Sequence, residues 1–217
     1  MTVWSIVVAA GAGNRFGGAK QFAVLAGRAV VDWSLAAARA ASDGVVLVLP
    51  ADGKPAGTDL GAAARRGADV AVAGGATRAA SVRAGLHVVP PNAHVVVVHD
   101  AARPLASPVL FRAVVDAVSD GADGAVPVVP VTDTLKRVAG GVVEGTVDRA
   151  GLVAVQTPQA FRADALRRAH DLPSEATDDA ALVEAAGGTV RVVPGDPRNL
   201  KITTAADLAI AEALVGR

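Results

Sequence analysis

The stretch 3–21 reads VWSIVVAAGAGNRFGGAKQ, an apolar, β-branched run that leads directly into a glycine-rich segment. Its first part, 3–9, is almost continuously apolar, which is typical of a strand buried on both faces of a parallel sheet. Glycine lets the backbone turn tightly and bring N–H groups against phosphate oxygens, and Arg15 and Lys20 add positive charge nearby. The stretch therefore predicts a strand that ends in a cradle for a polyphosphate.

Apolar strands alternate with alanine-rich helical segments along most of the chain. Further strands are predicted at 45–49, 69–73, 94–98 and 125–129. Helices are predicted at 30–41, 60–66, 78–87 and 108–119, the last with an N-cap and a first-turn proline at Ser107-Pro108. This alternation predicts an α/β fold, with a Rossmann-like, mostly parallel sheet covered by helices on both faces.

The alternation is interrupted at 132–150. Residues 132–147 are polar, β-prone and split by Gly140-Gly141, which predicts a β-arm that projects from a single domain spanning 1–217. The α/β pattern then returns with strands at 152–155 and 189–193, a further strand ending near 199–203, and helices near 164–170 and 178–186. A last helix begins at Thr204, where Thr204 and Asp207 predict a capping box.

Composition limits the function classes. The 217 residues carry 21 basic and 21 acidic side chains, and a net charge of zero argues against nucleic acid or an anionic membrane as a partner. The longest uncharged stretch, 84–99, contains Pro90 and Pro91 and cannot span a membrane, and the N-terminus lacks a signal-peptide pattern. We therefore expect a cytoplasmic protein. With no cysteine and four scattered histidines, any metal must be held by oxygen.

The glycine segment does not match the two commonest phosphate-binding motifs. The dinucleotide fingerprint requires a third small residue where Phe16 stands, and the P-loop requires Ser or Thr after its lysine, where Gln21 stands. A strand-to-helix connector with two solvated bases remains an alternative for this segment alone.

Other segments add to the pattern, and together they resemble the 2-C-methyl-D-erythritol 4-phosphate cytidylyltransferases of the non-mevalonate isoprenoid pathway. The resemblance begins in the glycine loop and continues through GGATRAAS at 74–81 and HDAARP at 99–104. The resembling segments are 9–21, 74–86, 99–104, 133–137, 146–149, 156–161, 177–180 and 199–208. They span nearly the whole chain, and the resemblance implies CMP transfer from CTP to 2-C-methyl-D-erythritol 4-phosphate.

The resemblance assigns residues of the glycine loop, of 74–81 and of 99–104 to the binding of CTP. It implies catalytic roles for Arg15 and Lys20, whose charges would face a leaving pyrophosphate. The other nucleotide-binding residues it implies are Ala9, Ala10, Gly11, Gly13, Gly75, Arg78, Ser81, Asp100 and Ala101. One position departs from many relatives, because Ala76 stands where they carry an acidic residue. Base discrimination is then expected to depend more on backbone groups.

Asp100 follows an apolar strand, and a carboxylate at the carboxyl end of a central parallel strand lies where such sheets bind ligands. We expect Asp100 to bind Mg2+, because magnesium takes one or two carboxylates together with phosphate oxygens and water. His99 is expected to be structural.

The resemblance also implies a set of substrate-binding residues: Arg103, Thr134, Arg149, Thr157, Thr177 and Lys201. Among them, Arg149 is implied to reach the substrate of a second subunit across a homodimer formed through the β-arm. From its residues alone, the arm could equally be a solvated hairpin, although a lone hairpin is marginally stable in water.

Three alternatives remain open at this point. The acceptor could be another polyol phosphate, such as ribitol 5-phosphate, because relatives of that kind share much of the loop and the DAARP stretch. A nicotinamide-dependent oxidoreductase is a second alternative, with Asp52 in the position of the ribose-binding acid. The third is a non-catalytic nucleotide sensor on the same fold.

Overall fold

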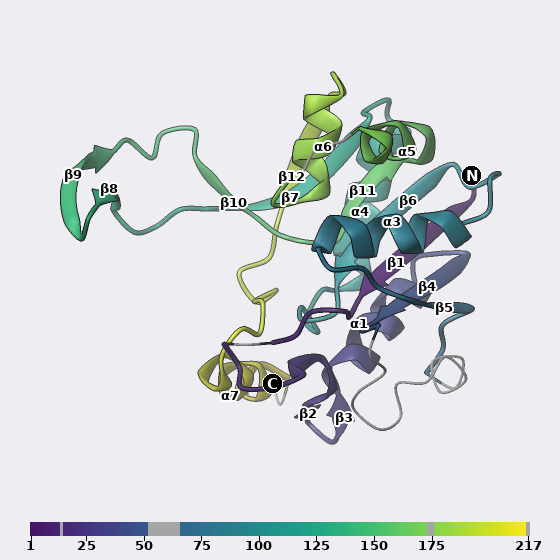
Figure 1. Cartoon of the computed structure of the whole chain (residues 1–217), viewed down its shortest axis with the longest axis horizontal. Coiled ribbons are helices and arrows are strands. Elements are labelled where there is room, and N and C mark those ends of the chain that lie inside the picture. The colour runs from purple at the N-terminus through teal and green to yellow at the C-terminus, as the bar shows by residue number, and fades with distance from the viewer. Residues whose placement is uncertain (14, 52–65, 173–175, 216–217) are drawn as a thin grey trace.

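The computed structural model describes residues 1–13, 15–51, 66–172 and 176–215 and places a twisted sheet at the centre of the molecule (Figure 1). The sheet strands are β1 (Val3–Val8), β4 (Gly44–Leu49), β5 (Val70–Ala73), β6 (Val95–Asp100), β7 (Gly124–Pro130), β10 (Val153–Val155), β11 (Gln159–Arg162) and β12 (Val190–Pro194). Their order is β10-β7-β11-β6-β1-β4-β5, with β12 also pairing with β7. Four of the pairings, β1–β4, β1–β6, β4–β5 and β7–β12, are parallel. The predicted mostly parallel α/β fold is confirmed.

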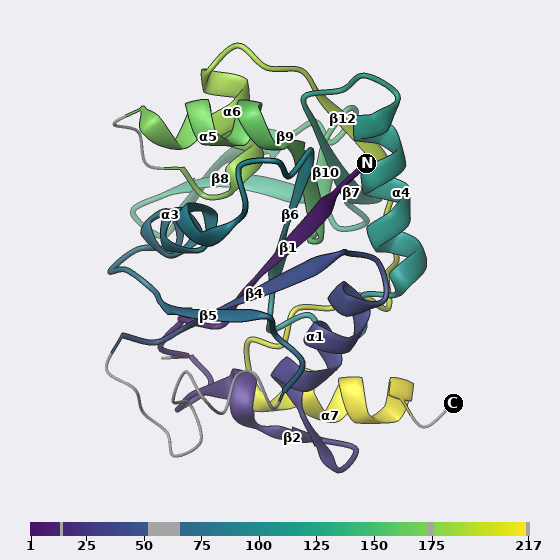
Figure 2. The same cartoon turned by 90° about the vertical axis from the view of Figure 1, so that its right-hand side faces the viewer.

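Helices cover both faces of this sheet (Figure 2). They are α1 (Val30–Arg39), α3 (Arg78–Val88), α4 (Pro108–Ser119), α5 (Ala163–Asp171) and α6 (Asp179–Ala185). A further helix, α7 (Ala205–Val215), packs instead beside the short strand β2 (Val24–Leu25). Strand alternation divides the core in two, because Val7 packs with α1 and α4 while Ile6 packs with α3, α5 and α6. Both side chains are fully buried. The near-continuous apolar strands of the sequence are therefore explained by burial on two faces.

The predicted helix starts are confirmed where capping residues were identified. The Ser107 side chain accepts from the Leu110 N–H at the start of α4, and Pro108 is its first residue. Thr204 and Asp207 bond reciprocally before α7, with the Thr204 N–H 2.8 Å from Asp207 Oδ2 and the Asp207 N–H 3.3 Å from Thr204 Oγ1. In the part of the chain that the structure describes, no helix is long and apolar enough to cross a membrane.

Some predicted elements differ from the structure. The antiparallel strand β11 was not predicted, and it inserts between β6 and β7. The prediction of a strand ending near 199–203 was wrong, because these residues form an irregular segment whose Ile202 N–H bonds to Ala102 O. The predicted helix 60–66 falls almost entirely outside the described residues, as does Asp52.

Three short elements complete the fold around the glycine segment: η1 (Lys20–Phe22), β2 (Val24–Leu25) and β3 (Arg28–Ala29). They pack beside α7 through a small apolar cluster that includes Leu25, Ile202 and Ala211. The cluster thereby joins the segment that follows the glycine loop to the carboxyl-terminal helix.

The β-arm is a separate two-stranded hairpin that extends away from the sheet, at the left of Figure 1. Its strands are β8 (Leu135–Ala139) and β9 (Val142–Val147). Gly140 and Gly141 have φ values of 55° and 80°, the positive region that a tight two-residue hairpin turn requires. The predicted hairpin is thus present, and its valines at 138, 142 and 143 are exposed.

Candidate active site

A cleft of about 320 Å3 opens where β1, β5 and β6 end. Its lining comes from the glycine loop, the start of α3, the end of β6 and the segment before α7. These stretches are far apart in the sequence. The sheet brings them together, because β1, which leads into the glycine loop, lies between β6 and β4. The lining includes Ala9, Ala10, Gly11, Lys20, Gly75, Arg78, Ser81, Asp100, Ala101 and Lys201.

The glycine loop is held by its own backbone and by one buried side chain. Gly13 has a φ of 68°, and a Cβ placed there would lie 1.9 Å from Gly18 O, so only glycine fits. The Gln21 amide donates to Ala9 O at 2.7 Å and to Gly11 O at 3.2 Å. Gln21 therefore fixes the beginning of the loop to its end, a role that sequence reasoning missed.

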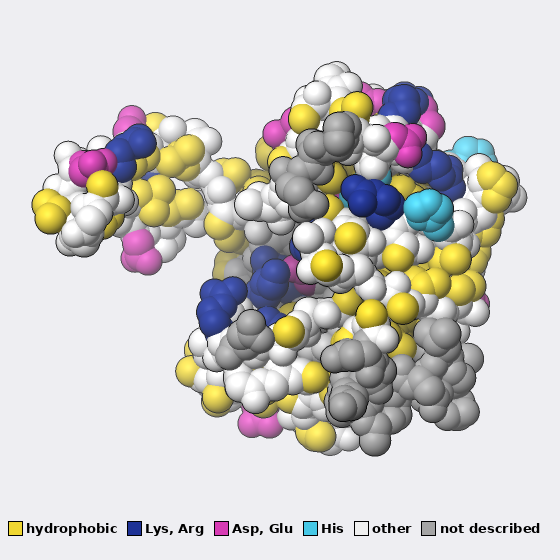
Figure 3. All heavy atoms as spheres, viewed as in Figure 1, with side chains coloured by type: hydrophobic (Ala, Val, Ile, Leu, Met, Phe, Trp, Pro, Cys, Tyr) yellow, Lys and Arg dark blue, Asp and Glu magenta, His cyan; other side chains and the backbone are white. Residues whose placement is uncertain are grey.

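Arg15 and Lys20 lie on the same side of this loop. Together with Gly11, Gly13 and Thr203 they line a smaller hollow of about 210 Å3 next to the cleft, and Lys20 borders both spaces. Burial lowers the pKa of Lys20, and the positive charges of Lys201 and Arg15 lower it further. Figure 3 shows Lys and Arg side chains gathered around the hollow between the arm and the lower part of the molecule. This local cationic field exists although the chain as a whole is neutral.

Asp100 is the last residue of β6 and the centre of a charge network. Its Oδ2 lies 2.6 Å from Lys201 Nζ, and its Oδ1 lies 3.3 Å from Arg78 Nε. Burial alone would raise the pKa of Asp100, but Arg78 and Lys201 more than offset this and hold it well below its ordinary value. Asp100 is therefore an ionised carboxylate, and Lys201 points into the cleft.

Arg78 is bound on its other side by Asp179, the first residue of α6. The Arg78 Nη1 lies 2.6 Å from Asp179 Oδ2, and Asp179 is fully buried. Burial opposes the charged form of Arg78, yet Asp179 and Asp100 together raise its pKa. As the first residue of α6, Asp179 could simply favour the start of a helix. Its charge instead fixes the guanidinium of a candidate nucleotide-binding residue.

The wall opposite the loop is formed by the turn from β5 into α3. A Cβ on Gly75 would lie 2.5 Å from the Ala80 Cβ, so the backbone approaches the helix closely there. The Gly75 N–H donates to Ser81 Oγ at 3.1 Å, and the Ser81 hydroxyl donates to Thr77 O at 2.9 Å. Ala76, the departure from many relatives, also lines the cleft.

Buried polar side chains hold the backbone of Asp100 in place. Its N–H donates to Thr157 Oγ1 at 3.0 Å, and the same hydroxyl lies 3.2 Å from His99 Nδ1. Burial lowers the pKa of His99 to about 4, which keeps the ring neutral at pH 7. Thr157 is 5% exposed, so its hydroxyl supports Asp100 from the interior of the protein. His99 is structural, as the sequence predicted.

Arg103 lies next to this network but does not line the cleft. Its Nη1 donates to Asn199 O at 2.7 Å, and the Asn199 amide donates to Thr157 O at 2.9 Å. Burial lowers the pKa of Arg103, while Asp100 opposes this effect. Asn199 is fully buried and connects Arg103 with Thr157, a second contribution that the sequence did not reveal.

Arg103 and Thr157, two of the predicted substrate residues, are thus outside the cleft lining, and three more also lie away from it. Thr134 and Arg149 belong to the arm, where the Arg149 guanidinium donates to Thr132 O. Thr177 is exposed just before α6, next to the N-cap residue Asp178. Within one chain, the described residues therefore do not bring the arm residues to Asp100.

The residues present fit a magnesium ion only in combination with a phosphate ligand. Among the described residues, no group of three or more His, Asp or Glu side chains could hold a metal by itself. Asp100 supplies one ionised carboxylate at the cleft, and magnesium binds with one or two carboxylates where phosphate oxygens and water complete its coordination. Asp100 with a bound polyphosphate meets that requirement.

Comparison with known proteins identifies the family. The family model for 2-C-methyl-D-erythritol 4-phosphate cytidylyltransferase matches residues 3–217. The chain belongs to this family. It is 47% identical to the cytidylyltransferase of that name from Saccharopolyspora erythraea, over 99% of this chain and 100% of the relative.

Further members of the family support the assignment. The crystal structure of the cytidylyltransferase from Thermus thermophilus superposes with a TM-score of 0.81 at 37% identity, covering 100% of this chain and 99% of that one. A bifunctional enzyme IspD/IspF from Clavibacter michiganensis is 47% identical over 98% of this chain, which spans 54% of its length. The predicted family, fold and cytidylyltransferase class are confirmed, and the oxidoreductase alternative is not supported.

Proposed function

We propose that this cytidylyltransferase transfers CMP from CTP to the phosphate of 2-C-methyl-D-erythritol 4-phosphate in isoprenoid precursor biosynthesis. Its products are 4-diphosphocytidyl-2-C-methyl-D-erythritol and pyrophosphate. The observation that carries the proposal is the meeting of the glycine loop and Lys20 with the Asp100–Lys201 pair in one cleft. Membership of the family supports the choice of both substrates.

The reaction needs charge stabilisation more than proton transfer. An oxygen of the substrate phosphate attacks the α-phosphorus of CTP, a new P–O bond forms, and the bond to the β-phosphate oxygen breaks as pyrophosphate leaves. The attacking phosphate is already ionised near pH 7, so no general base is required. Fixed cations that face the developing negative charge lower such a barrier. We assign this role to Arg15 and Lys20.

The remaining residues divide between the two substrates. Gly75 and Ser81 form the wall that we assign to the cytosine base, and Arg78 orders that wall through Asp179. Ala9, Ala10, Gly11, Gly13 and Ala101 present backbone groups to the nucleotide. We assign Arg103, Thr177 and Lys201 to the methylerythritol phosphate, and Thr157 to the support of Asp100.

Magnesium completes the proposal. Asp100 would hold the ion together with oxygens of the triphosphate, and the bound ion would add divalent positive charge to the leaving group. Asp100 is suited to this role because Arg78 and Lys201 keep it ionised. The two charged substrates do not cross membranes unaided, which favours a cytoplasmic enzyme.

We also propose that the enzyme is a homodimer that pairs through the β-arm. The arm exposes Val138, Val142 and Val143, and a two-stranded hairpin of this kind needs a surface on which to pack. Thr134 and Arg149 lie on this arm, away from the cleft of their own chain. In the dimer they would serve the acceptor site of the partner.

A pyrophosphate-release assay tests the proposal. CTP with 2-C-methyl-D-erythritol 4-phosphate should give turnover, and ATP or UTP in place of CTP should give far less. Ribitol 5-phosphate is the matched alternative acceptor. Full activity with ribitol 5-phosphate and none with the methylerythritol compound would overturn the acceptor assignment. CTP binding without any pyrophosphate release would favour a sensor.

A further inference from the structure

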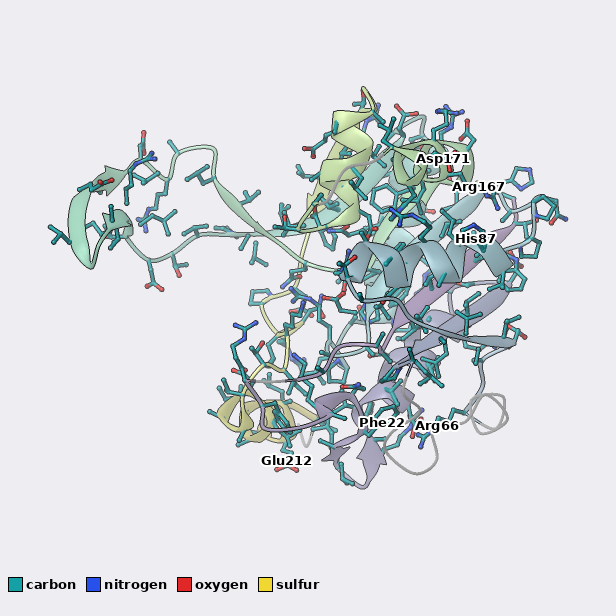
Figure 4. All side chains as sticks on the ribbon, in the orientation of Figure 1. Phe22, Arg66, His87, Arg167, Asp171 and Glu212 are labelled. Carbon is teal, nitrogen blue, oxygen red and sulfur yellow. The ribbon has the colours of Figure 1, made fainter. Side chains whose placement is uncertain are left out.

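A second cavity of about 320 Å3 lies between α3 and α5, and none of the residues that line it lines the active-site cleft. Its charged and polar lining residues are Arg83, His87, Arg167, His170 and Asp171. Figure 4 labels His87, Arg167 and Asp171, which come from α3 and α5 and lie on the same side of the molecule. The proposed transferase function uses none of these side chains.

Two arginines give the cavity positive charge. Arg83 Nε donates to His170 O at 3.2 Å, and Arg167 Nη2 donates to Val89 O at 3.3 Å and Pro90 O at 3.1 Å. These bonds hold each guanidinium by one edge. The other N–H groups of both arginines bond to no described residue. Asp171 supplies the only acidic side chain among the described lining residues, so the two arginines outnumber it.

His170 is the buried group of this cavity. It is 4% exposed, and its Nε2 lies 3.0 Å from Asp179 Oδ1. Its Nδ1 is buried and has no hydrogen-bond partner among the described residues. The ring of His170 is therefore a buried wall of the cavity, held in place by Asp179.

The rest of the lining adds one more polar edge and an apolar surface. His87 Nδ1 lies 2.7 Å from Arg83 O, so Nδ1 donates to this carbonyl and Nε2 is left at the other edge of the ring. Leu86, Val89 and Pro91 provide the apolar contacts. The cavity therefore combines a cationic edge with an apolar one, a pairing that suits a ligand with one anionic end.

We propose that this cavity is a second ligand site, which binds a phosphate monoester carrying a small apolar group. The phosphate accepts from Arg83 and Arg167, and the apolar group packs on Leu86, Val89 and Pro91. The His170 ring lines the same cavity, with its Nε2 3.0 Å from Asp179 Oδ1. Arginine is well suited to this role, because its planar fork donates two parallel bonds to phosphate oxygens.

Phenyl phosphate is the probe, and calorimetry on the full chain measures its affinity with CTP present at saturation, so that the active site is occupied. Arg167→Gln should weaken binding by about tenfold or more, because it removes a charge-assisted hydrogen bond. Arg168→Gln is the matched control. It makes the same change at the next residue of α5, where the side chain pairs with Asp164 and does not line the cavity. His87→Gln is a second test, because it changes an exposed residue of the cavity lining and leaves the buried contacts in place.

The outcomes separate the alternatives. Saturable binding that Arg167→Gln weakens and Arg168→Gln does not would support the site. Equal effects of the two variants, displacement of the probe by CTP, or no saturable binding would overturn it. Inorganic phosphate and benzyl alcohol are tested as further ligands in the same assay. Phosphate that binds as tightly as the ester would exclude an organic ligand, and benzyl alcohol that does so would exclude a phosphate site.

Discussion

Arg78 and Asp179 lie 101 residues apart in the chain, and their side chains form an ion pair of 2.6 Å. The pair joins the start of α3 to the start of α6 across the wall of the cleft. Asp179 also faces His170, and Arg78 also faces Asp100, so one buried carboxylate connects two groups of charged residues. The position of Arg78 in the cleft therefore depends on a residue outside it.

Removing this buried charge should destabilise the fold. We expect Asp179→Asn to lower the free energy of unfolding by about 2–4 kcal/mol, because Arg78 would lose its closest partner while remaining largely buried. The control is Asp164→Asn, which removes an exposed carboxylate from its pairs with Arg162 and Arg168 and should cost less than about 1 kcal/mol. Urea unfolding of both variants measures the difference. Similar losses in the two variants would contradict the role of Asp179.

Lys20→Ala should affect turnover more than nucleotide binding. If Lys20 faces charge that develops as pyrophosphate leaves, kcat should fall by about 100-fold or more while the affinity for CTP changes less. Arg15→Ala should behave in the same way. Arg191→Ala, an exposed arginine of β12 whose Nη1 donates to Asp120 O, is the control and should be neutral. A rise in KM for CTP with kcat unchanged would assign Lys20 to binding alone.

The glycine loop offers a matched pair of substitutions. At Gly13 an added Cβ would lie 1.9 Å from Gly18 O, whereas at Gly17 it would meet nothing within 4 Å, and both residues have positive φ. Gly13→Ala should displace the loop and reduce kcat/KM by about 100-fold or more, since small misplacements of positioning groups have effects of this size. Gly17→Ala carries only the backbone strain, about 1–2 kcal/mol. Steady-state kinetics should therefore rank Gly13→Ala well below Gly17→Ala.

His99 predicts a pH dependence of stability. Burial lowers its pKa from 6.5 to about 4, so between these values the unfolded chain binds a proton that the folded chain does not. Stability should then fall as the pH falls below 6.5, with a slope that approaches about 1.4 kcal/mol per pH unit. His99→Gln should show a shallower decline between pH 6.5 and pH 5 in urea titrations. Identical slopes in the two proteins would show that His99 is not the source.

The arm predicts the state of assembly. Val138 is 56% exposed on the arm and Val192 is 63% exposed on β12, so the two valines allow the same substitution at similar exposure. Val138→Asp should dissociate the proposed homodimer in light scattering and lower activity with it, whereas Val192→Asp should not. A chain that is monomeric before substitution would refute the dimer.

Much of this fold could be predicted, because parallel strands that are buried on both faces appear in the sequence as almost continuous runs of apolar residues. The stretch 3–9 and the strands near Val97 and Val126 are examples, and the glycine pair at 140–141 located the arm turn. Strand β11 has no such apolar run. It is four residues long, contains Gln159 and Arg162, and is specified by its two neighbours in the sheet.

The candidate site was predictable only in part, for a related reason. Arg15, Lys20, Asp100 and Lys201 belong to local motifs, so the sequence could single them out. Asp179 and Asn199 act through contacts with residues far away in the chain, at Arg78 and Arg103, and no local pattern indicates such partners. Gln21 lay inside the recognised motif, yet its role needed the positions of Ala9 O and Gly11 O.

The way the arm leaves the sheet has a consequence for its evolution. Pro130, where the chain departs, pairs directly with Val153, where it returns, so the base of the excursion is closed by the sheet itself. Insertions, deletions or exchanges between these two points need not shift the register of β7 or disturb the ends of β1 and β6. The arm can thus diversify independently of the sheet edge that carries Asp100.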